Sequence, residues 1–274
     1  MSLTWPLGIQ LPLPDAFASD RGFSDLLGVL RDERFSELEL GIPDIDQVPG
    51  SRLRRYLAGH GFALTRLATG AAARRHGLSL SSPDERTRVE SVQRCISMIA
   101  WAAEIGAEVI IGILKGVPGS ADARAGELLL RSMEEISRKV GRSPVPVLLE
   151  VTHRGECPVI TTPQEAAAAI APYPEFGWRV LLDTWHLERQ GLPVAAALAS
   201  APDLRGSLHC SDDNRRLPGF GRMGFAPILR ALASRGYAGS LVLEGTFGPD
   251  PCADVRQSAA FLRREARDAA RGRR

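Results

Sequence analysis

Four short apolar segments in the second half of the chain each finish with a side chain that can bind a metal ion. "VPVLLE" ends at Glu150, "WRVLLD" at Asp183 and "SLVLE" at Glu244, while "GSLHC" carries His209 beside its last residue. Apolar runs of this length are typical of buried parallel strands. Neighbouring parallel strands lie about 4.8 Å apart, so we expect groups at their carboxyl ends to converge.

Three carboxylates that met unpaired at one place would repel one another and raise each other's pKa values. A divalent cation removes this repulsion, and a set of three carboxylates and one imidazole suits a hard or borderline ion. We therefore predict one divalent metal ion, with Mn²⁺ expected and Mg²⁺, Co²⁺ or Zn²⁺ as alternatives. The predicted ligands are Glu150, Asp183, His209 and Glu244.

The elements that must position these ligands alternate along the whole chain. Strand candidates cover 7–11, 36–41, 62–69, 108–113, 145–151, 178–183, 204–210 and 239–245. Helical patterns cover 20–34, 47–59, 83–105, 120–141, 223–235 and 251–268, with further helices from Pro163 and around 193–200. Eight such alternations predict an α/β fold, a (β/α)₈ TIM barrel, as a single domain over residues 1–274. The alternative is an open doubly wound sheet, but "PLPDAFASD" after the first strand lacks its glycine-rich turn.

The sequence also predicts two helix starts and places basic residues after the third and fourth strands. Ser82, Pro83 and Glu85 predict a capping box for one helix, and Thr162, Pro163 and Glu165 predict another. We expect a long loop after the third strand. Its residues 74–76, "RRH", could clamp a substrate, although we favour solvated loop residues. Lys115, after the fourth strand, is left open between a substrate contact and a surface cation.

Several longer motifs resemble one family over nearly the whole chain. They are "SLSSPDERTRVESVQRCISMIAWAAEIGAEVI", "LLEVTHRGE", "LLDTWHL", "LHCSDDNRRLPGFGRMGF" and "GYAGSLVLEG". The chain is similar to the sugar isomerase/epimerase superfamily with a xylose-isomerase-like TIM barrel, and most similar to its ketose 3-epimerases. The resemblance implies one divalent metal ion on the four residues named above.

The resemblance also assigns roles within the reaction. It implies that Glu150 and Glu244 act as the acid/base pair, and that Glu156, His186 and Arg215 contact the substrate. Epimerisation or isomerisation of a keto-sugar or related polyol ketone passes through a cis-enediolate, whose negative charge the metal stabilises. One carboxylate removes the proton beside the carbonyl and the other returns one. His186 is expected on the loop just beyond its strand.

The chain departs from the family pattern at two places. His153 stands where an asparagine is usual, and Gly224 stands where an aspartate usually precedes Phe225. Both positions can change the substrate and the reaction, so a lyase is the main alternative: a metal-dependent dehydratase of a keto-inositol or dehydroshikimate-like substrate. The abasic-site endonucleases of this fold need extra histidines after strands three, four and seven, and "RLATG", "GILKG" and "GFGRMGF" lack them. A non-catalytic sugar-binding barrel is disfavoured because binding alone needs no acid/base pair.

Composition narrows the partners and the compartment. The net charge of +2 lacks the basic stripe of a nucleic-acid-binding protein, and six arginines in the last twelve residues fit a solvated helix end. No stretch approaches the eighteen apolar residues of a membrane span, and the N-terminus has no signal-peptide pattern. We expect a cytoplasmic enzyme that binds a small sugar or polyol ketone, with no nucleic-acid or membrane partner. Homo-oligomerisation is left open.

Overall fold

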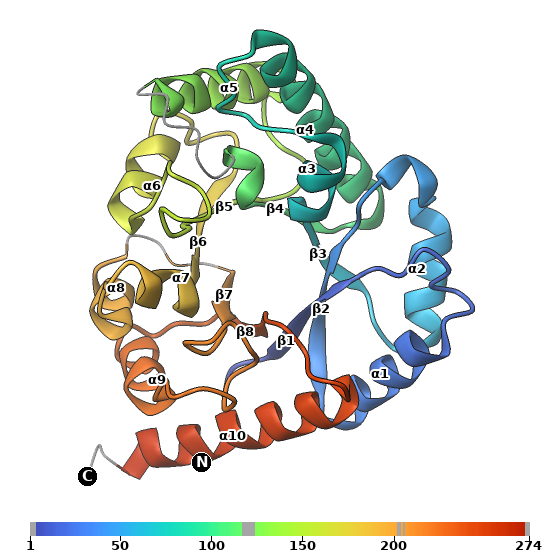
Figure 1. The fold of residues 1–274 in the computed structure, drawn as a ribbon, viewed down its shortest axis with the longest axis vertical. Helices are drawn as coiled ribbons and strands as arrows, with labels where there is room; N and C mark the ends of the chain where they lie inside the picture. Colours follow the sequence, from blue (N-terminus) through green and yellow to red (C-terminus); the bar gives the residue numbers. More distant parts are fainter. Residues whose placement is uncertain (1–3, 117–123, 202–203, 205, 272–274) are drawn as a thin grey trace.

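Eight parallel strands close into a barrel that is surrounded by helices (Figure 1). The structure is a computed structural model that describes residues 4–116, 124–201, 204 and 206–271. The strands are β1 (Leu7–Pro12), β2 (Phe35–Gly41), β3 (Leu64–Ala68), β4 (Glu108–Ile111), β5 (Val147–Glu150), β6 (Trp178–Asp183), β7 (Ser207–Cys210) and β8 (Ser240–Leu243). All eight predicted strands are present in the predicted order, so the TIM barrel is confirmed and the open sheet is excluded.

The helices form the outer layer of the barrel. They are α1 (Arg21–Asp32), α2 (Gly50–Gly59), α3 (Gly70–His76), α4 (Glu85–Ile105), α5 (Ala125–Val140), α6 (Pro163–Ile170), α7 (Thr184–Arg189), α8 (Val194–Ser200), α9 (Phe225–Ser234) and α10 (Pro251–Arg271). Two short 3₁₀ helices, η1 (Ile45–Gln47) and η2 (Ile113–Lys115), complete the described elements. α10 packs on both α1 and α9, so the last helix closes the ring (Figure 1). None of the helices in the described ranges combines the length and apolar character of a membrane span.

Two sequence predictions about helices are wrong. The residues after β3 form the helix α3 rather than a long loop. The N-cap of α4 is Asp84, whose side chain accepts from the backbone N–H of Thr87, so the predicted capping box of Ser82 and Glu85 does not form. Ser82 and Asp84 are both good capping residues, and the choice between them depends on where the chain meets the barrel. The predicted capping box of Thr162 and Glu165 is present on α6, and the expected helix start at 120–123 lies outside the described residues.

The strand register staggers around the barrel and decides which groups share a level. Glu150 pairs with Leu181, two residues before Asp183, and Asp183 pairs with His209. His209 pairs in turn with Val242, two residues before Glu244. Because side chains alternate across a strand, steps of two keep every member of this series on the same face. The register therefore directs these side chains into the barrel and toward its carboxyl end.

Charged side chains fill part of the barrel interior below that level. The Arg66 guanidinium on β3 donates to Glu37 at 2.6 Å, to Glu39 at 3.0 Å and to Glu108 at 2.8 Å. Glu108 also accepts from Arg179 at 3.1 Å. A small apolar cluster lies among the strands and is separate from the main core between strands and helices; its members are Ile110, Leu148 and Leu181. Buried charges persist when each has partners, and this network supplies them on four strands, β2, β3, β4 and β6.

Candidate functional site

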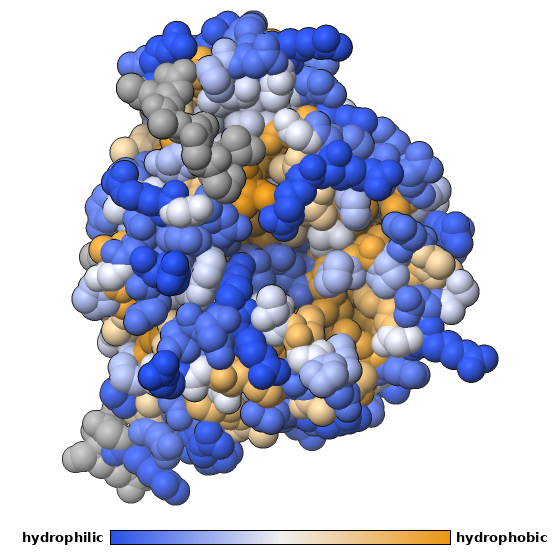
Figure 2. Space-filling view, viewed as in Figure 1, coloured by the Kyte–Doolittle hydropathy of each residue, from blue (hydrophilic) through white to orange (hydrophobic). Residues whose placement is uncertain are grey.

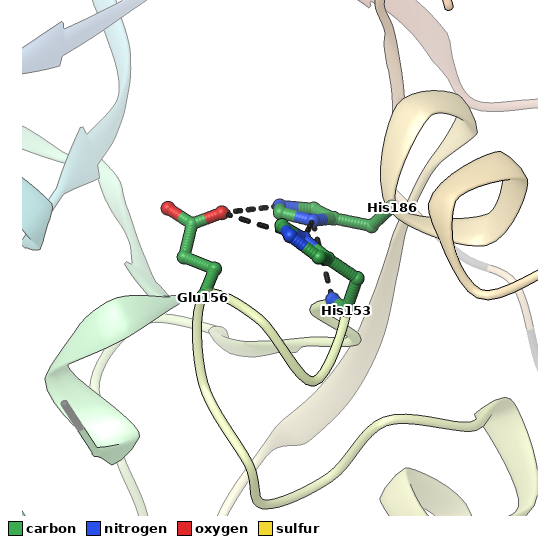
Figure 3. Close-up of side chains that lie close together, drawn as sticks. All are labelled: His153, Glu156 and His186. Carbon is green, nitrogen blue, oxygen red and sulfur yellow. Dashed lines mark hydrogen bonds and ion pairs between the residues drawn. The ribbon is translucent and has the colours of Figure 1, made fainter. Parts of the chain in front are cut away.

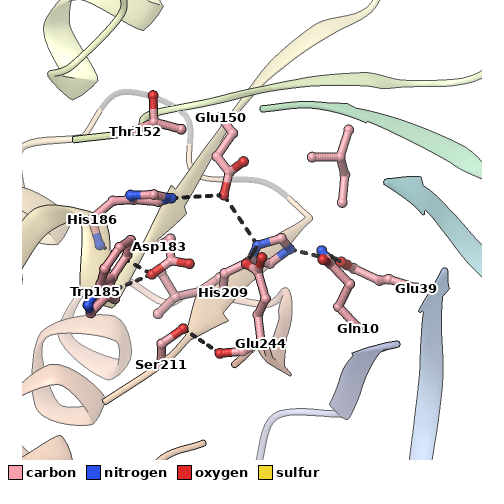
Figure 4. Close-up of polar contacts among 12 residues, drawn as sticks. Gln10, Glu39, Glu150, Thr152, Asp183, Trp185, His186, His209, Ser211 and Glu244 are labelled. Carbon is pink, nitrogen blue, oxygen red and sulfur yellow. Dashed lines mark hydrogen bonds and ion pairs between the residues drawn. The ribbon is translucent and has the colours of Figure 1, made fainter. Parts of the chain in front are cut away.

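The structure brings the four predicted metal ligands together at the carboxyl end of the barrel (Figure 4). Glu150 and Asp183 are the last residues of β5 and β6, His209 lies in β7, and Glu244 directly follows β8. One ligand atom from each residue lies within 4.8 Å of the others. Asp183 and His209 are fully buried, and Glu150 is only 7% exposed.

Three atoms of this cluster are buried and have no hydrogen-bond partner: Glu150 Oε1, His209 Nδ1 and Glu244 Oε2. His209 Nδ1 lies 2.7 Å from Glu244 Oε2 and 3.5 Å from Glu150 Oε1, so the three converge on one place. Buried polar atoms are normally paired, and leaving them unpaired costs free energy. A divalent cation would satisfy all three at once, so the residues present fit such an ion.

Glu39 determines which nitrogen of His209 faces the cluster. Its Oε2 lies 2.9 Å from His209 Nε2, and both side chains are fully buried. A carboxylate accepts, so Nε2 carries a proton and Nδ1 is the nitrogen left to bind a cation. Burial lowers the pKa of His209, but Glu39 and Glu244 outweigh it and raise that pKa well above its usual value. Glu39 was not among the predicted site residues.

The pKa values of the two candidate acid/base carboxyls are shifted in opposite directions. Burial raises the pKa of Glu150, and the negative charge of Glu244 adds to it. Burial also raises the pKa of Glu244, but Arg215 and His209 outweigh it and hold the pKa at about 2. Gly112, just after β4, leaves room for Glu150, because a Cβ at that position would overlap Glu150 Oε2.

Arg215 bridges two of the ligands. It donates from Nη1 to Asp183 Oδ2 at 2.6 Å and from Nη2 to Glu244 Oε1 at 2.7 Å. Its guanidinium lies 4.6 Å from the centre of the Trp185 ring. Arg215 has φ 61°, a left-handed conformation that costs a non-glycine residue free energy. Contacts elsewhere in its loop must therefore hold Arg215 in this backbone conformation.

The loop between β7 and α9 supplies that constraint through Asp212. The buried Asp212 carboxylate accepts from the backbone N–H groups of Gly219 and Met223, both at 2.9 Å. The N–H of Thr246 donates to the carbonyl oxygen of Arg215 at 2.8 Å, which ties the loop to the segment after β8. Asp212 thus folds the loop so that Arg215 reaches the cluster.

His186 and Glu156 form a second polar group (Figure 3), and His186 Nε2 lies 3.9 Å from Glu150 Oε1 of the metal-capable cluster. His186 Nε2 lies 3.3 Å from Glu156 Oε2. His186 lies within α7, so its predicted place on a loop is wrong. Burial lowers the pKa of His186 to about 3, whereas burial and the charge of Glu150 raise the pKa of Glu156 to about 7. At neutral pH a neutral imidazole therefore faces a carboxyl that readily gains a proton.

His153 completes a triad with these two residues, and the three could in principle hold a metal ion. The N–H of His153 donates to His186 Nδ1 at 3.2 Å, and His153 Nδ1 lies 2.9 Å from the same atom. His186 Nδ1 therefore accepts hydrogen bonds, and its Nε2 carries the proton that faces Glu156. With both nitrogens engaged in this way, hydrogen bonding explains the triad without a metal ion.

Lys115 is neither a surface cation nor a group that lines the mouth cavity. It is fully buried, and its Nζ donates to the carbonyl oxygen of Glu150 and to Thr152 Oγ1. It also lies 3.5 Å from the carbonyl oxygen of Ile160. Lys115 therefore fastens the segment that follows β5, which carries His153 and Glu156.

A cavity of about 460 Å³ opens over the cluster and gives a small molecule access to it. Glu150, Glu156, His186, Arg215 and Glu244 all line it, so the predicted substrate contacts and the predicted acid/base pair share one space. Figure 2 shows a hollow in the middle of this face of the molecule, bordered by both apolar and hydrophilic surface.

Comparison with known proteins assigns the fold to a family. A family model described as the xylose isomerase-like TIM barrel matches residues 29–265. The chain belongs to this family. The prediction made from the sequence motifs is thereby confirmed.

Curated proteins similar to this chain include sugar epimerases. The D-psicose 3-epimerase of Ruminiclostridium cellulolyticum is 27% identical over 212 residues, which cover 74% of this chain and 70% of that protein. The 3-dehydro-D-guloside 4-epimerase of Escherichia coli is 30% identical over 135 residues, about half of each chain, covering 49% of this one and 50% of that protein. A solved L-ribulose 3-epimerase structure superposes with a TM-score of 0.79 and 22% identity, covering 96% of both chains, and supports the fold.

Proposed function

We propose that the protein is a divalent-metal-dependent sugar epimerase or isomerase that acts on a keto-sugar or related polyol ketone. The observation that carries the proposal is the convergence of three unpartnered buried atoms, on Glu150, His209 and Glu244, below a cavity open to a small molecule. Asp183 completes the proposed ligand set. The similarity to sugar epimerases supports the substrate class.

In the proposed reaction, Glu150 and Glu244 move the proton. They approach His209 from two sides (Figure 4), and their pKa values are shifted in opposite directions. One carboxylate takes the proton from the carbon beside the carbonyl, and the other delivers a proton to the enediolate. The divalent cation, when bound, supplies positive charge that stabilises the negative charge developing on the substrate oxygens. We expect Mn²⁺ as the ion.

Three further residues are proposed to bind and orient the substrate. The Nε2–H of His186 and the guanidinium of Arg215 can donate to substrate oxygens, since both side chains line the cavity. Glu156 holds His186 at 3.3 Å and lines the same cavity, so it can both orient this donor and accept from a hydroxyl. These contacts would hold the reacting carbon next to the acid/base pair, which is a large part of catalysis. The oligomeric state and a cytoplasmic location stay predictions.

Deuterium exchange tests the proposal directly. Mn²⁺-loaded protein in D₂O would be given D-psicose, L-ribulose and a 3-dehydro-D-glucoside, and the products analysed by NMR after removal of the metal. We expect deuterium beside the carbonyl together with an epimer or isomer. The rate should fall by about 10²–10⁴-fold in Glu150→Gln and in Glu244→Gln, but not in the exposed control Glu188→Gln. Loss of water from the substrate would instead support a dehydratase, and no exchange by a Mn²⁺-bound protein would contradict the proposal.

A further inference from the structure

The two halves of the barrel mouth differ in polarity. The half formed by β5 to β8 carries the charged cluster. The half formed by β1 to β4 lines the cavity with small or apolar groups, among them Leu11, Ala68, Ile110 and Ile113. In the described residues of this second half, the polar side chains on the cavity wall are Gln10, Thr69 and Arg74. A long polyol chain would find few hydrogen-bonding partners here.

Two of these three polar groups are already engaged. Thr69 Oγ1 donates to the carbonyl oxygen of Ile110 at 2.7 Å, and Gln10 Nε2 lies 3.5 Å from Glu39 Oε2. Arg74 has no hydrogen bond or ion pair within the described part of the chain. It is therefore the cationic side chain of this half that is free to bind a ligand.

Arg74 reaches the mouth although it lies in the last turn of α3. Helical side chains lean toward the N-terminus of their helix. Accordingly, Arg74 Nη2 lies 3.5 Å from the point where a Cβ on Gly70 would be, at the start of α3, and Ile113 Cγ1 lies equally close to that point. Arg74 lines both the 460 Å³ cavity and a neighbouring cavity of about 570 Å³ that extends to Trp185. The guanidinium thus stands where the two spaces meet.

The other charged groups of the mouth have partners other than Arg74. Arg215 is neutralised by Asp183 and Glu244, at 2.6 and 2.7 Å. With a divalent cation in place, the cation and Arg215 together balance the three carboxylates of the proposed ligand set. Glu156, a fourth carboxyl on the wall, accepts a hydrogen bond from His186 at 3.3 Å and makes no ion pair with Arg74 among the described contacts. Arg74 is therefore a cation on the cavity wall without an ion-pair partner in the described part of the chain.

We propose that Arg74 binds an anionic group, a phosphate ester or a carboxylate, at the end of the substrate remote from the reacting carbonyl. The planar fork of a guanidinium matches both anions with paired hydrogen bonds. The preferred substrate would then be a keto-sugar phosphate or a keto-sugar acid rather than a neutral ketose. This inference rests on the proposed function and adds the substrate's charge to it.

Arg75 provides a matched control for the test. It is the next residue of α3, is exposed like Arg74, and does not line either cavity. Exchange and epimerisation would be measured for the Mn²⁺-loaded wild type, Arg74→Gln and Arg75→Gln. The substrates would be D-psicose, its 6-phosphate, and a ketose whose terminal carbon is a carboxylate.

We expect the wild type to favour one or both anionic substrates by at least about tenfold in kcat/KM. Arg74→Gln should lose about 10- to 100-fold on those substrates, mainly through KM, and should lose much less on D-psicose. Arg75→Gln should behave as the wild type. The phosphate and carboxylate arms separate the two anion sources. Equal loss in both variants, or a wild type that treats neutral and anionic ketoses alike, would overturn the inference while leaving the epimerase proposal intact.

A binding measurement tests anion recognition by Arg74 even where no turnover is seen. D-glucitol 6-phosphate and D-glucitol have no carbonyl and cannot react, so calorimetric titration of the metal-loaded protein reports charge recognition alone. Tighter binding of the phosphate, lost in Arg74→Gln and kept in Arg75→Gln, would support the inference. Equal affinities for the two polyols would contradict it. Absence of exchange with every ketose would count against the proposed function only.

Discussion

At the residue level, Glu39 is expected to tune metal binding although it touches no substrate. Its Oε2 accepts the Nε2 proton of His209, with 2.9 Å between Oε2 and Nε2, and leaves Nδ1 toward the cluster. Partners of this kind orient ligating histidines and raise their basicity, and their loss costs about 10- to 100-fold in metal affinity. We therefore expect Glu39→Gln to weaken Mn²⁺ binding about tenfold or more, measured by electron paramagnetic resonance of free Mn²⁺.

Glu37 is the control for this prediction because it lies two residues away on β2. It pairs with Arg66 at 2.6 Å, as part of the same charged network, but has no hydrogen bond to His209 among the described contacts. Glu37→Gln should therefore leave the Mn²⁺ affinity close to that of the wild type. An equal loss in both variants would mean that the network acts through general stability.

The raised pKa of Glu156 predicts a pH-dependent stability in the metal-free protein. Its pKa is about 7 in the folded state, against an ordinary 4.5. The folded state therefore holds a proton that the unfolded state loses, so this stabilisation is complete below pH 4.5 and is lost as the pH rises through 7. After discounting for partial exposure, the loss amounts to about 1–3 kcal/mol.

Substitution of Glu156 removes this dependence. In urea denaturation with a chelator present, Glu156→Gln should be less sensitive than the wild type to a change from pH 5 to pH 8. The exposed Glu188→Gln on α7 should keep the wild-type dependence. Parallel pH profiles for the wild type and Glu156→Gln would show that the Glu156 carboxyl titrates normally.

Single residues also mark the limit of what the sequence predicts. Glu150, Asp183 and Glu244 were identified because strand ends are visible as apolar runs that finish in a carboxylate. Glu39 lies inside "SELEL", and the alternation there does not tell whether its glutamates face solvent or the barrel interior. The sequence signal that could have placed Glu39 in the interior was the presence of Arg66 and Glu108 on the next two strands, since buried charges on neighbouring strands need oppositely charged partners.

At the level of elements, Lys115 connects η2 to the segment after β5. Its amino group donates to the carbonyl oxygen of Glu150 and to Thr152 Oγ1, and lies 3.5 Å from the carbonyl oxygen of Ile160. Lys115→Met would leave these acceptors buried without partners, and we expect it to destabilise the fold by about 2–4 kcal/mol. Amide hydrogen exchange should become faster in residues 151–162, which carry His153 and Glu156.

The exposed Lys139 of α5 provides the control for Lys115→Met. Lys139→Met removes the same charge from the surface, so its stability and its exchange in residues 151–162 should match the wild type. Faster exchange across the whole barrel in Lys115→Met, rather than in this segment, would argue against a local fastening role.

The errors in predicting elements have a common physical origin. Residues 70–76, "GAAARRH", form α3, although a segment of this length is too short to be stable as a helix by itself. Basic side chains in the last turn favour the helix dipole, and tertiary contacts with η2 supply the rest. His186 was misplaced in the same way, because Asp183 caps α7 by accepting from Trp185 and so starts a helix directly at the strand end.

At the level of the whole molecule, the barrel follows from a pattern that repeats eight times and tolerates errors in any one unit. Each strand boundary is off by only a few residues, yet the order and the closure hold. The stagger between strands cannot be deduced from the sequence, because it depends on how the sheet closes. That stagger decides that Asp183 is level with His209 while Glu150 pairs with Leu181. We propose that the chain works as one domain, since the proposed ligands come from four strands of one barrel.

This arrangement predicts that metal binding reverses the order of stability of the wild type and Glu150→Gln. Glu150 is buried and lies with two other carboxylates, so Glu150→Gln relieves desolvation and repulsion and should stabilise the metal-free protein by about 1–3 kcal/mol at pH 8. A ligand that binds the folded state only adds about 4.1 kcal/mol at a concentration of 1,000 times Kd. With Mn²⁺ at that concentration, the wild type should therefore become the more stable of the two, because Glu150→Gln has lost a ligand.

Thermal unfolding with and without Mn²⁺ measures this change in the order of stability, and the exposed Glu90→Gln of α4 should follow the wild type in both conditions. An unchanged order after addition of Mn²⁺ would mean that Glu150 does not bind the ion.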